Sequence, residues 1–200
     1  MKSIRRFTLV ELLAVIALIA ILSGIGFGAY SYARGKAKES ATEAMMKQIE
    51  AGLESFHARF GYYPPTDGEF KPIIFKFDTD GTPDYIDFGG TGGKLTLHKG
   101  TSMSKKERME NEQIESFTKV MDMEVVKNNI DDDGRITDSW GGKIYYRSPG
   151  TFKAGSFDLI SAGPDGVFSK EQKDTPAGLT TLTNFRELSG EHVCDDLFTF

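Results

Sequence analysis

The chain is short of the residues that most metal and redox chemistry needs. It has one cysteine, Cys194, among 200 residues, so an intrachain disulfide and a thiolate metal cluster are both excluded. We expect Cys194 to be a small apolar residue, with an intermolecular bridge in an oxidising compartment as the alternative. His57, His98 and His192 are scattered along the sequence and form no His-Glu-x-x-His pair.

Catalytic and nucleotide-binding motifs are also missing. The sequence has no Gly-x-Ser-x-Gly elbow. Residues 89–94 resemble a phosphate loop, but Phe88 stands at the first glycine position and Leu95 replaces the Ser or Thr that would hold magnesium, so we interpret them as a glycine turn. The net charge of −5 lacks the basic footprint of a nucleic-acid binder. The sequence therefore predicts neither an enzyme nor a nucleic-acid partner.

Charge is nearly absent from one long stretch, residues 7–33, whose only charged side chain is Glu11. About 20 apolar residues span a bilayer, so we expect a single membrane-spanning helix. The run is longer than a typical signal-peptide core of roughly 7–15 residues, and no small-x-small cleavage site closes it. Lys2, Arg5 and Arg6 precede it and predict a cytoplasmic N-terminus.

Glu11 is the first functional candidate, because an acid within a membrane span costs roughly 2.5–3.5 kcal/mol. Such a carboxylate needs a compensating group, and we expect a second copy of the chain to supply it. A plain single-pass anchor is the simplest alternative, but it gives no reason for an acid at this position.

The segment Phe7-Thr-Leu-Val-Glu11-Leu-Leu resembles the processing and assembly signature of type IV pilins and of the pseudopilins of type II secretion. The resemblance implies that prepilin peptidase cuts before Phe7 and methylates the new amine. It also implies that Glu11 pairs with the terminal amine of a neighbouring subunit. The chain departs from the family at Arg6, where the family has glycine. Two outcomes stay open: cleavage before Phe7, or an uncut chain in which Glu11 needs another cation, such as Arg5 or Arg6 of a neighbour.

The helix is expected to continue beyond the membrane, from about residue 8 to residue 60. Gly61 and the prolines at 64 and 65 should end it. An apolar stripe at helical spacing should hold its second half against an antiparallel sheet. The members of this stripe are Ala37, Ala41, Met45, Ile49, Leu53, Phe56 and Phe60.

Short apolar runs predict strands at 73–77, 85–88 and 95–98, and a central hairpin at 143–146 and 157–160. Between these groups, Ser104 and Glu107 fit a capping box, and the apolar spacing that follows predicts a second helix over 104–126.

Residues 138–146, Asp-Ser-Trp-Gly-Gly-Lys-Ile-Tyr-Tyr, resemble the Asp-x-Trp-Gly-x-Pro-Tyr-x-Tyr segment of secretion pseudopilins, without its proline. We interpret this segment as a structural turn that feeds a strand, with Trp140 packed on the long helix. A carbohydrate-stacking tryptophan is the alternative.

Residues 157–166, together with Asp195 and Asp196, resemble the calcium-binding arrangement of major pseudopilins. The resemblance implies that Asp165, Asp195 and Asp196 hold one calcium, with turn carbonyls as further ligands, and calcium favours such oxygen donors. The family's loop is short, whereas this chain carries an insertion at 167–194, so a solvated acidic turn remains the alternative.

Two weaker acidic clusters, 78–84 and 131–134, lack the full twelve-residue calcium pattern, and we expect solvated turns there.

The sequence thus predicts an α+β, pilin-like fold in which a long N-terminal helix, first transmembrane and then amphipathic, packs on a small antiparallel sheet. The expected organisation is a leader at 1–6, a transmembrane and assembly segment at 7–33, and a periplasmic or extracellular domain at 34–200.

The resemblance implies a subunit of a type II secretion pseudopilus in the bacterial inner membrane. Its partners would be copies of itself, other pseudopilins, prepilin peptidase and the secretion assembly platform. A type IV pilin of a surface filament and an unprocessed membrane-tethered binding module are the alternatives.

Overall fold

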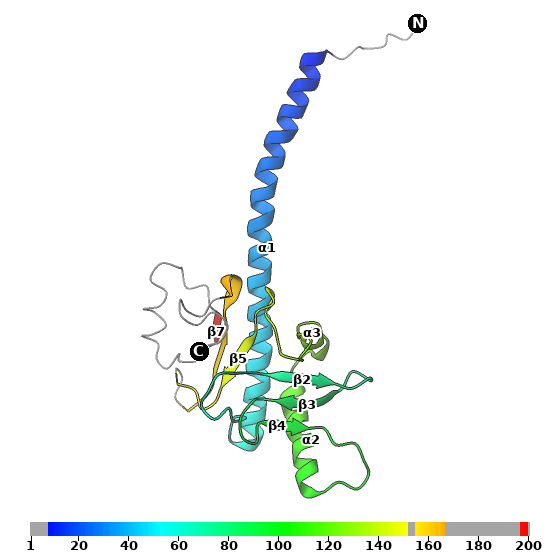
Figure 1. The fold of residues 1–200 in the computed structure, drawn as a ribbon, viewed down its shortest axis with the longest axis vertical. Coiled ribbons are helices and arrows are strands. Elements are labelled where there is room, and N and C mark those ends of the chain that lie inside the picture. The colour runs from blue at the N-terminus through cyan, green and yellow to red at the C-terminus, as the bar shows by residue number, and fades with distance from the viewer. Residues whose placement is uncertain (1–7, 152–154, 167–196, 200) are drawn as a thin grey trace. The chain divides into compact units, whose positions relative to one another are not determined.

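The computed structural model describes residues 8–151, 155–166 and 197–199, and its first element is a long helix, α1 (Leu9–Phe60) (Figure 1). The predicted helix over 8–60 is confirmed. The chain divides into two compact units, Met1–Ser40 and Ala41–Phe200. Each unit is described below by itself.

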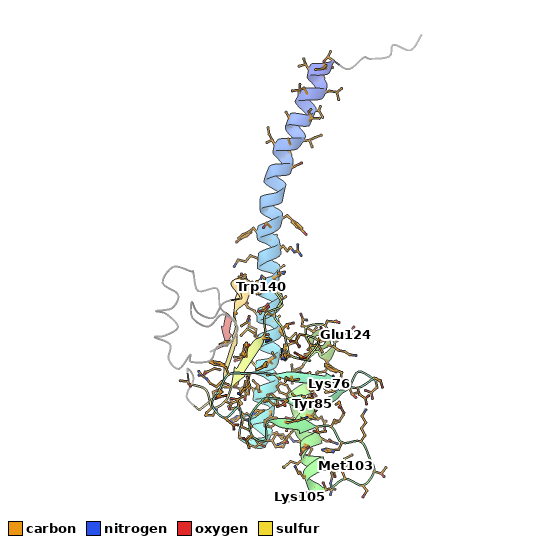
Figure 2. The ribbon with its side chains drawn as sticks, in the orientation of Figure 1. Lys76, Tyr85, Met103, Lys105, Glu124 and Trp140 are labelled. Carbon is orange, nitrogen blue, oxygen red and sulfur yellow. The ribbon has the colours of Figure 1, made fainter. Side chains whose placement is uncertain are left out.

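The first unit consists, in its described part, of the N-terminal half of α1. The large apolar side chains that the structure describes in this half are exposed, and Figure 2 draws them as sticks along the helix. Leu9, Leu13 and Leu22 expose 78%, 57% and 60% of their surfaces. This is the one helix of the described chain that is long and apolar enough to cross a membrane, a test that a signal sequence also meets.

The second half of α1 buries one face in the core of the second unit. Met45, Ile49, Leu53 and Phe56 are buried, as the apolar stripe predicts. The start of that stripe is wrong, because Ala37 and Ala41 are exposed, whereas Phe60 at its end is partly buried and packs against the core. The reason is the period of the helix: repeated steps of four residues drift around the axis, whereas the real buried face mixes steps of three and four.

The buried face of α1 includes two positions that the predicted stripe left out. Met46 is buried, and Gly52 lies so close to the second helix that a Cβ there would stand 2.7 Å from the Phe117 carbonyl oxygen. The core that these residues join contains side chains from both sheets and both later helices.

Two antiparallel sheets complete this unit (Figure 1). One has the strand order β1-β5-β6-β7, and the other has the order β2-β3-β4. The first sheet comprises β1 (Lys71–Pro72), β5 (Ile144–Arg147), β6 (Asp158–Ser161) and β7 (Leu197–Thr199). The second comprises β2 (Ile74–Phe77), β3 (Pro83–Asp87) and β4 (Lys94–Thr96). Every predicted strand is therefore confirmed, with ends shifted by up to two residues.

The centre of the first sheet is the predicted hairpin of β5 and β6, in which every residue of both strands is buried. Ile144 pairs with Ser161, and Arg147 pairs with Asp158. The Arg147–Asp158 pair is an ion pair inside the protein, with side chains 4% and 3% exposed and Nε donating to Oδ2 at 3.0 Å. The Thr151 N–H donates to the same Asp158 oxygen at 2.7 Å, and the Phe70 ring lies 4.0 Å from the guanidinium carbon.

The predicted helix over 104–126 is two helices, α2 (Lys105–Thr118) and α3 (Met123–Lys127). The capping box of Ser104 and Glu107 is confirmed at the start of α2. The interruption has a local cause, because the Asp122 carboxylate accepts hydrogen bonds from the N–H groups of Glu124 and Val125. Such N-cap bonds start a new helix, and apolar spacing alone does not reveal them.

Candidate functional site

Glu11 begins the candidate site, and the structure places it in the first turn of α1, where it forms a capping box with Thr8. The Thr8 backbone N–H and hydroxyl donate to Glu11 Oε2 at 2.8 and 2.9 Å. The Glu11 N–H donates back to the Thr8 hydroxyl oxygen at 3.2 Å. Reciprocal bonds of this kind satisfy backbone N–H groups that have no partner at a helix start.

The capping box was missed by sequence reasoning although its signal was present, since Thr8-x-x-Glu11 has the capping-box spacing. It shows that Glu11 is compensated in part by its own chain. Within the described residues both bonds end on Oε2, and Oε1 accepts none. The carboxylate therefore keeps one oxygen for a further donor.

The surroundings of Glu11 are apolar and exposed. Val10 and Leu12 expose 75% and 59% of their surfaces, and Leu9 and Leu13 expose 78% and 57%. A carboxylate amid exposed apolar side chains can form a charge pair with little competition from water once those side chains are covered. The two processing residues, Arg6 and Phe7, lie outside the described residues.

The second candidate segment, 138–146, is a turn organised by the buried carboxylate of Asp138. Oδ1 accepts from the N–H groups of Trp140 at 2.9 Å and Gly142 at 2.8 Å, and Oδ2 accepts from the Ser161 hydroxyl at 2.6 Å. Asp138 is only 4% exposed. Glycine fits at position 142, because a Cβ there would lie only 2.7 Å from Asp138 Oδ2.

This turn is also tied to α1. The Ser139 N–H donates to the Thr42 hydroxyl oxygen at 3.0 Å, and the Thr42 hydroxyl lies 3.1 Å from the Ser139 hydroxyl. Trp140, labelled in Figure 2, is half-buried and does not belong to the core cluster of the described residues. The segment is thus a structural turn as interpreted, but Ser139 forms the hydrogen bonds with the helix, and the packing of Trp140 on α1 stays a prediction.

The structure describes only part of the predicted calcium site. Asp195, Asp196 and the side chain of Asp165 lie outside the described residues. The backbone of the turn is described: β6 ends at Ser161, a short 3-10 helix covers Gly163–Asp165, and Gly166 follows with φ of 68°. The Gly163 N–H donates to the Ser161 hydroxyl oxygen at 3.1 Å.

One register observation concerns this turn. Strand β7 starts at Leu197, directly after Asp196, and Leu197 is the register partner of Ser161. The pairing therefore places Leu197, the residue that follows Asp196 in the sequence, on the strand next to β6. Among the residues that the structure describes, no group of three or more His, Cys, Asp or Glu side chains is arranged to hold a metal ion.

The two weaker acidic clusters are turns in which Asp78, Asp80, Asp131 and Asp133 have partners within the chain. Asp80 Oδ1 accepts from the Thr82 hydroxyl at 2.5 Å and from its N–H at 2.9 Å, and Lys99 Nζ lies 2.6 Å from Asp78. The Thr82 hydroxyl bond is the largest of the effects that lower the pKa of Asp80 to about 2.

In the other cluster, Asp131 Oδ1 accepts from the N–H groups of Asp133 and Arg135 at 3.0 and 2.9 Å. The Arg135 guanidinium pairs with the Asp133 carboxylate at 2.5 Å. N–H donors and a guanidinium of the chain thus contact the Asp131 and Asp133 carboxylates, and the segment forms a turn.

Residues 89–94 form a turn, and its glycines allow two loops to lie close together. A Cβ on Gly90 or Gly93 would overlap the Pro65 carbonyl oxygen. The Thr91 N–H donates to the Asp67 carboxylate at 2.8 Å, which fastens the two loops together.

No protein-family model, no curated protein and no solved structure matches the chain.

Proposed function

We propose that the chain is a filament subunit of the type IV pilin-like class, with a type II secretion pseudopilus as the assembly that fits best. One observation carries the proposal: a carboxylate, Glu11, stands in the first turn of a helix whose apolar side chains are exposed along its N-terminal half. Such a helix needs covering, first by lipid and then by identical helices in a filament.

The second unit supports the proposal through its layout. The second half of α1 packs its buried face into a core that contains strands of two antiparallel sheets. The Asp138 turn fastens the central hairpin to α1 through Ser139 and Thr42. This arrangement is compatible with the pilin-like fold that the sequence resemblance implies.

In the proposed assembly, Glu11 pairs with the amine of a neighbouring Phe7 after the leader is removed. The carboxylate has an oxygen left for this pair, since its helix-capping bonds use Oε2. Breaking a buried charge pair by removing one partner costs about 3–5 kcal/mol, which is enough to stop the growth of a filament.

Substitutions at the capping box separate the two roles of Glu11. Glu11→Gln keeps a capping acceptor and removes the charge, whereas Thr8→Val removes the capping hydroxyl and keeps the charge. We expect Glu11→Gln and Glu11→Ala to remain membrane-bound without filaments, and Thr8→Val to assemble. Filament yield by electron microscopy is the measurement. Normal filaments from Glu11→Gln, or equal losses in Glu11→Gln and Thr8→Val, would contradict the charge-pair role.

Calcium is part of the proposal, with Asp165, Asp195 and Asp196 as its carboxylate ligands. The support is the register of β6 and β7, which puts Ser161 opposite Leu197. Bound calcium would raise the melting temperature of the chain, and the rise would be absent in Asp165→Asn.

An unprocessed, membrane-tethered module is the second candidate, and Arg6 favours it because it replaces the glycine of the processing signature. In that case the leader would stay on the chain, and Glu11 would serve as a helix cap through Thr8.

A further inference from the structure

Just beyond the apolar half of α1, one helix face carries an aromatic residue followed by two cations. Tyr30, Arg34 and Lys38 are four residues apart, so they lie one above the other on this face. Tyr30 is 65% exposed, Arg34 is exposed and Lys38 is partly exposed. No Asp or Glu stands three or four residues from either cation, and neither forms an ion pair within the described part of the chain.

The opposite face also has a tyrosine and a lysine, but the lysine charge is paired with a glutamate. Tyr32 and Lys36 are again four residues apart, and Tyr32 is 71% exposed. Here Glu39 follows Lys36, and Lys36 Nζ lies 2.6 Å from Glu39 Oε2. The helix therefore has one face with two uncompensated positive charges and one face on which a lysine is already paired.

The position of these faces follows from helix geometry. A hydrocarbon core about 30 Å thick takes about 20 helical residues. If the uncharged run after Glu11 fills that core, the core ends near Tyr30 and Tyr32. Exposed tyrosines favour the headgroup layer. Arg34 and Lys38 then lie one and two turns further out, and their long side chains reach back to the lipid phosphates.

We propose that Tyr30, Arg34 and Lys38 form a binding surface for an anionic phospholipid headgroup, on the side of the membrane away from the leader. The surface and the lipid are complementary in charge, because the lipid phosphate meets two cations that have no acid three or four residues away, while the tyrosine ring lies at the level of the glycerol backbone. The inference rests on the proposed membrane placement of α1, and it adds a partner that the filament proposal does not require.

The test uses the full chain reconstituted in phosphatidylcholine vesicles with and without phosphatidylglycerol. After gentle detergent extraction, mass spectrometry measures which lipid stays bound. We expect wild type to retain phosphatidylglycerol in preference. Arg34→Gln/Lys38→Gln should lower that preference by about fivefold per cation at low salt, as expected for a basic residue near an anionic lipid surface. Lys36→Gln is the matched control, and we expect less than a twofold change.

Three results would overturn the inference. They are the absence of a wild-type preference between the lipids, a loss of preference in Lys36→Gln as large as in the double substitution, and displacement of the lipid by free inorganic phosphate. The last result would indicate a soluble anion site. Alkaline carbonate extraction separates this inference from the proposed function. Release of the chain from the vesicles would refute the membrane placement and the lipid surface together, whereas a retained chain without lipid preference would refute the lipid surface alone.

Discussion

Single polar residues with buried side chains fix how the long helix, the turn and the central hairpin of the second unit are joined. Asp138 is the clearest case, because its carboxylate accepts from two N–H groups of its own turn and from the Ser161 hydroxyl on β6. A buried donor that loses its acceptor costs about 1–3 kcal/mol. The one carboxylate therefore satisfies three groups that would otherwise be unpaired.

Asp138→Ala should destabilise the second unit by at least about 3 kcal/mol, because it leaves the donors of Trp140, Gly142 and Ser161 without their acceptor. Urea unfolding of the full chain in detergent, followed by circular dichroism, measures the change. Asp132→Ala is the control, since Asp132 is exposed, and it should change stability by less than about 0.5 kcal/mol. Equal effects of the two substitutions would show that the Asp138 bonds are not what holds the turn.

The sequence reveals some of these residues better than others. Glu11 is conspicuous because it is the only charge in an apolar run, and the Thr8 cap has a readable spacing. The bond between Asp138 and Ser161 joins residues 23 positions apart. The Arg147–Asp158 pair likewise depends on the register of β5 and β6. Neither contact leaves a local pattern, because each exists only after the strands have paired.

Among the helices and strands, the packing of α1 on α2 depends on Gly52, which has no side chain. Gly52→Ala would place a Cβ 2.7 Å from the Phe117 carbonyl oxygen and 2.9 Å from its ring. We expect a loss of about 1–3 kcal/mol from overpacking, larger than the helix-propensity gain of about 1 kcal/mol. Thermal unfolding of the full chain is the measurement.

Gly35→Ala is the matched control for this packing prediction. Gly35 belongs to the same helix, and a Cβ there meets nothing within 4 Å. It should raise helix stability or leave it unchanged. A stabilising Gly52→Ala would mean that α1 and α2 are not packed as closely as the structure places them.

The stability of the turn between β2 and β3 should depend on pH through Asp80. Asp80 has a pKa lowered to about 2, first through the Thr82 hydroxyl and N–H bonds and then through Lys99. Because the folded pKa lies below the usual value of about 3.9, this carboxylate stabilises the folded chain above about pH 4, and the effect is lost as the pH falls towards 2. Thr82→Val should raise the Asp80 pKa more than Lys99→Gln does, as measured by NMR titration of the carboxyl carbon. The reverse order would assign the shift to the ion pair.

The elements that the sequence predicts well are those with a long pattern or a firm stop. The end of α1 at Phe60 follows from Gly61 and the two prolines, and the central hairpin follows from its apolar runs. Strands β1 and β7 were not predicted, because two and three residues are too few to show alternation. The break between α2 and α3 was missed because the Asp122 cap competes with an apolar spacing that continues through it.

The whole molecule consists of an apolar helical unit and an α+β unit with its own core. In the proposed function, the first unit would supply membrane attachment and assembly, and the second would supply the surface that a filament displays. The central claim is that the chain is processed like a pilin precursor, which frees an amine for the Glu11 of a neighbour.

The most direct test is the intact mass and N-terminal sequence of the protein purified from its native membrane. The account predicts a chain that begins at N-methylated Phe7, despite Arg6 before it. A chain that still begins at Met1 would contradict the account, because no amine would be available at Phe7, and would favour the unprocessed, membrane-tethered module.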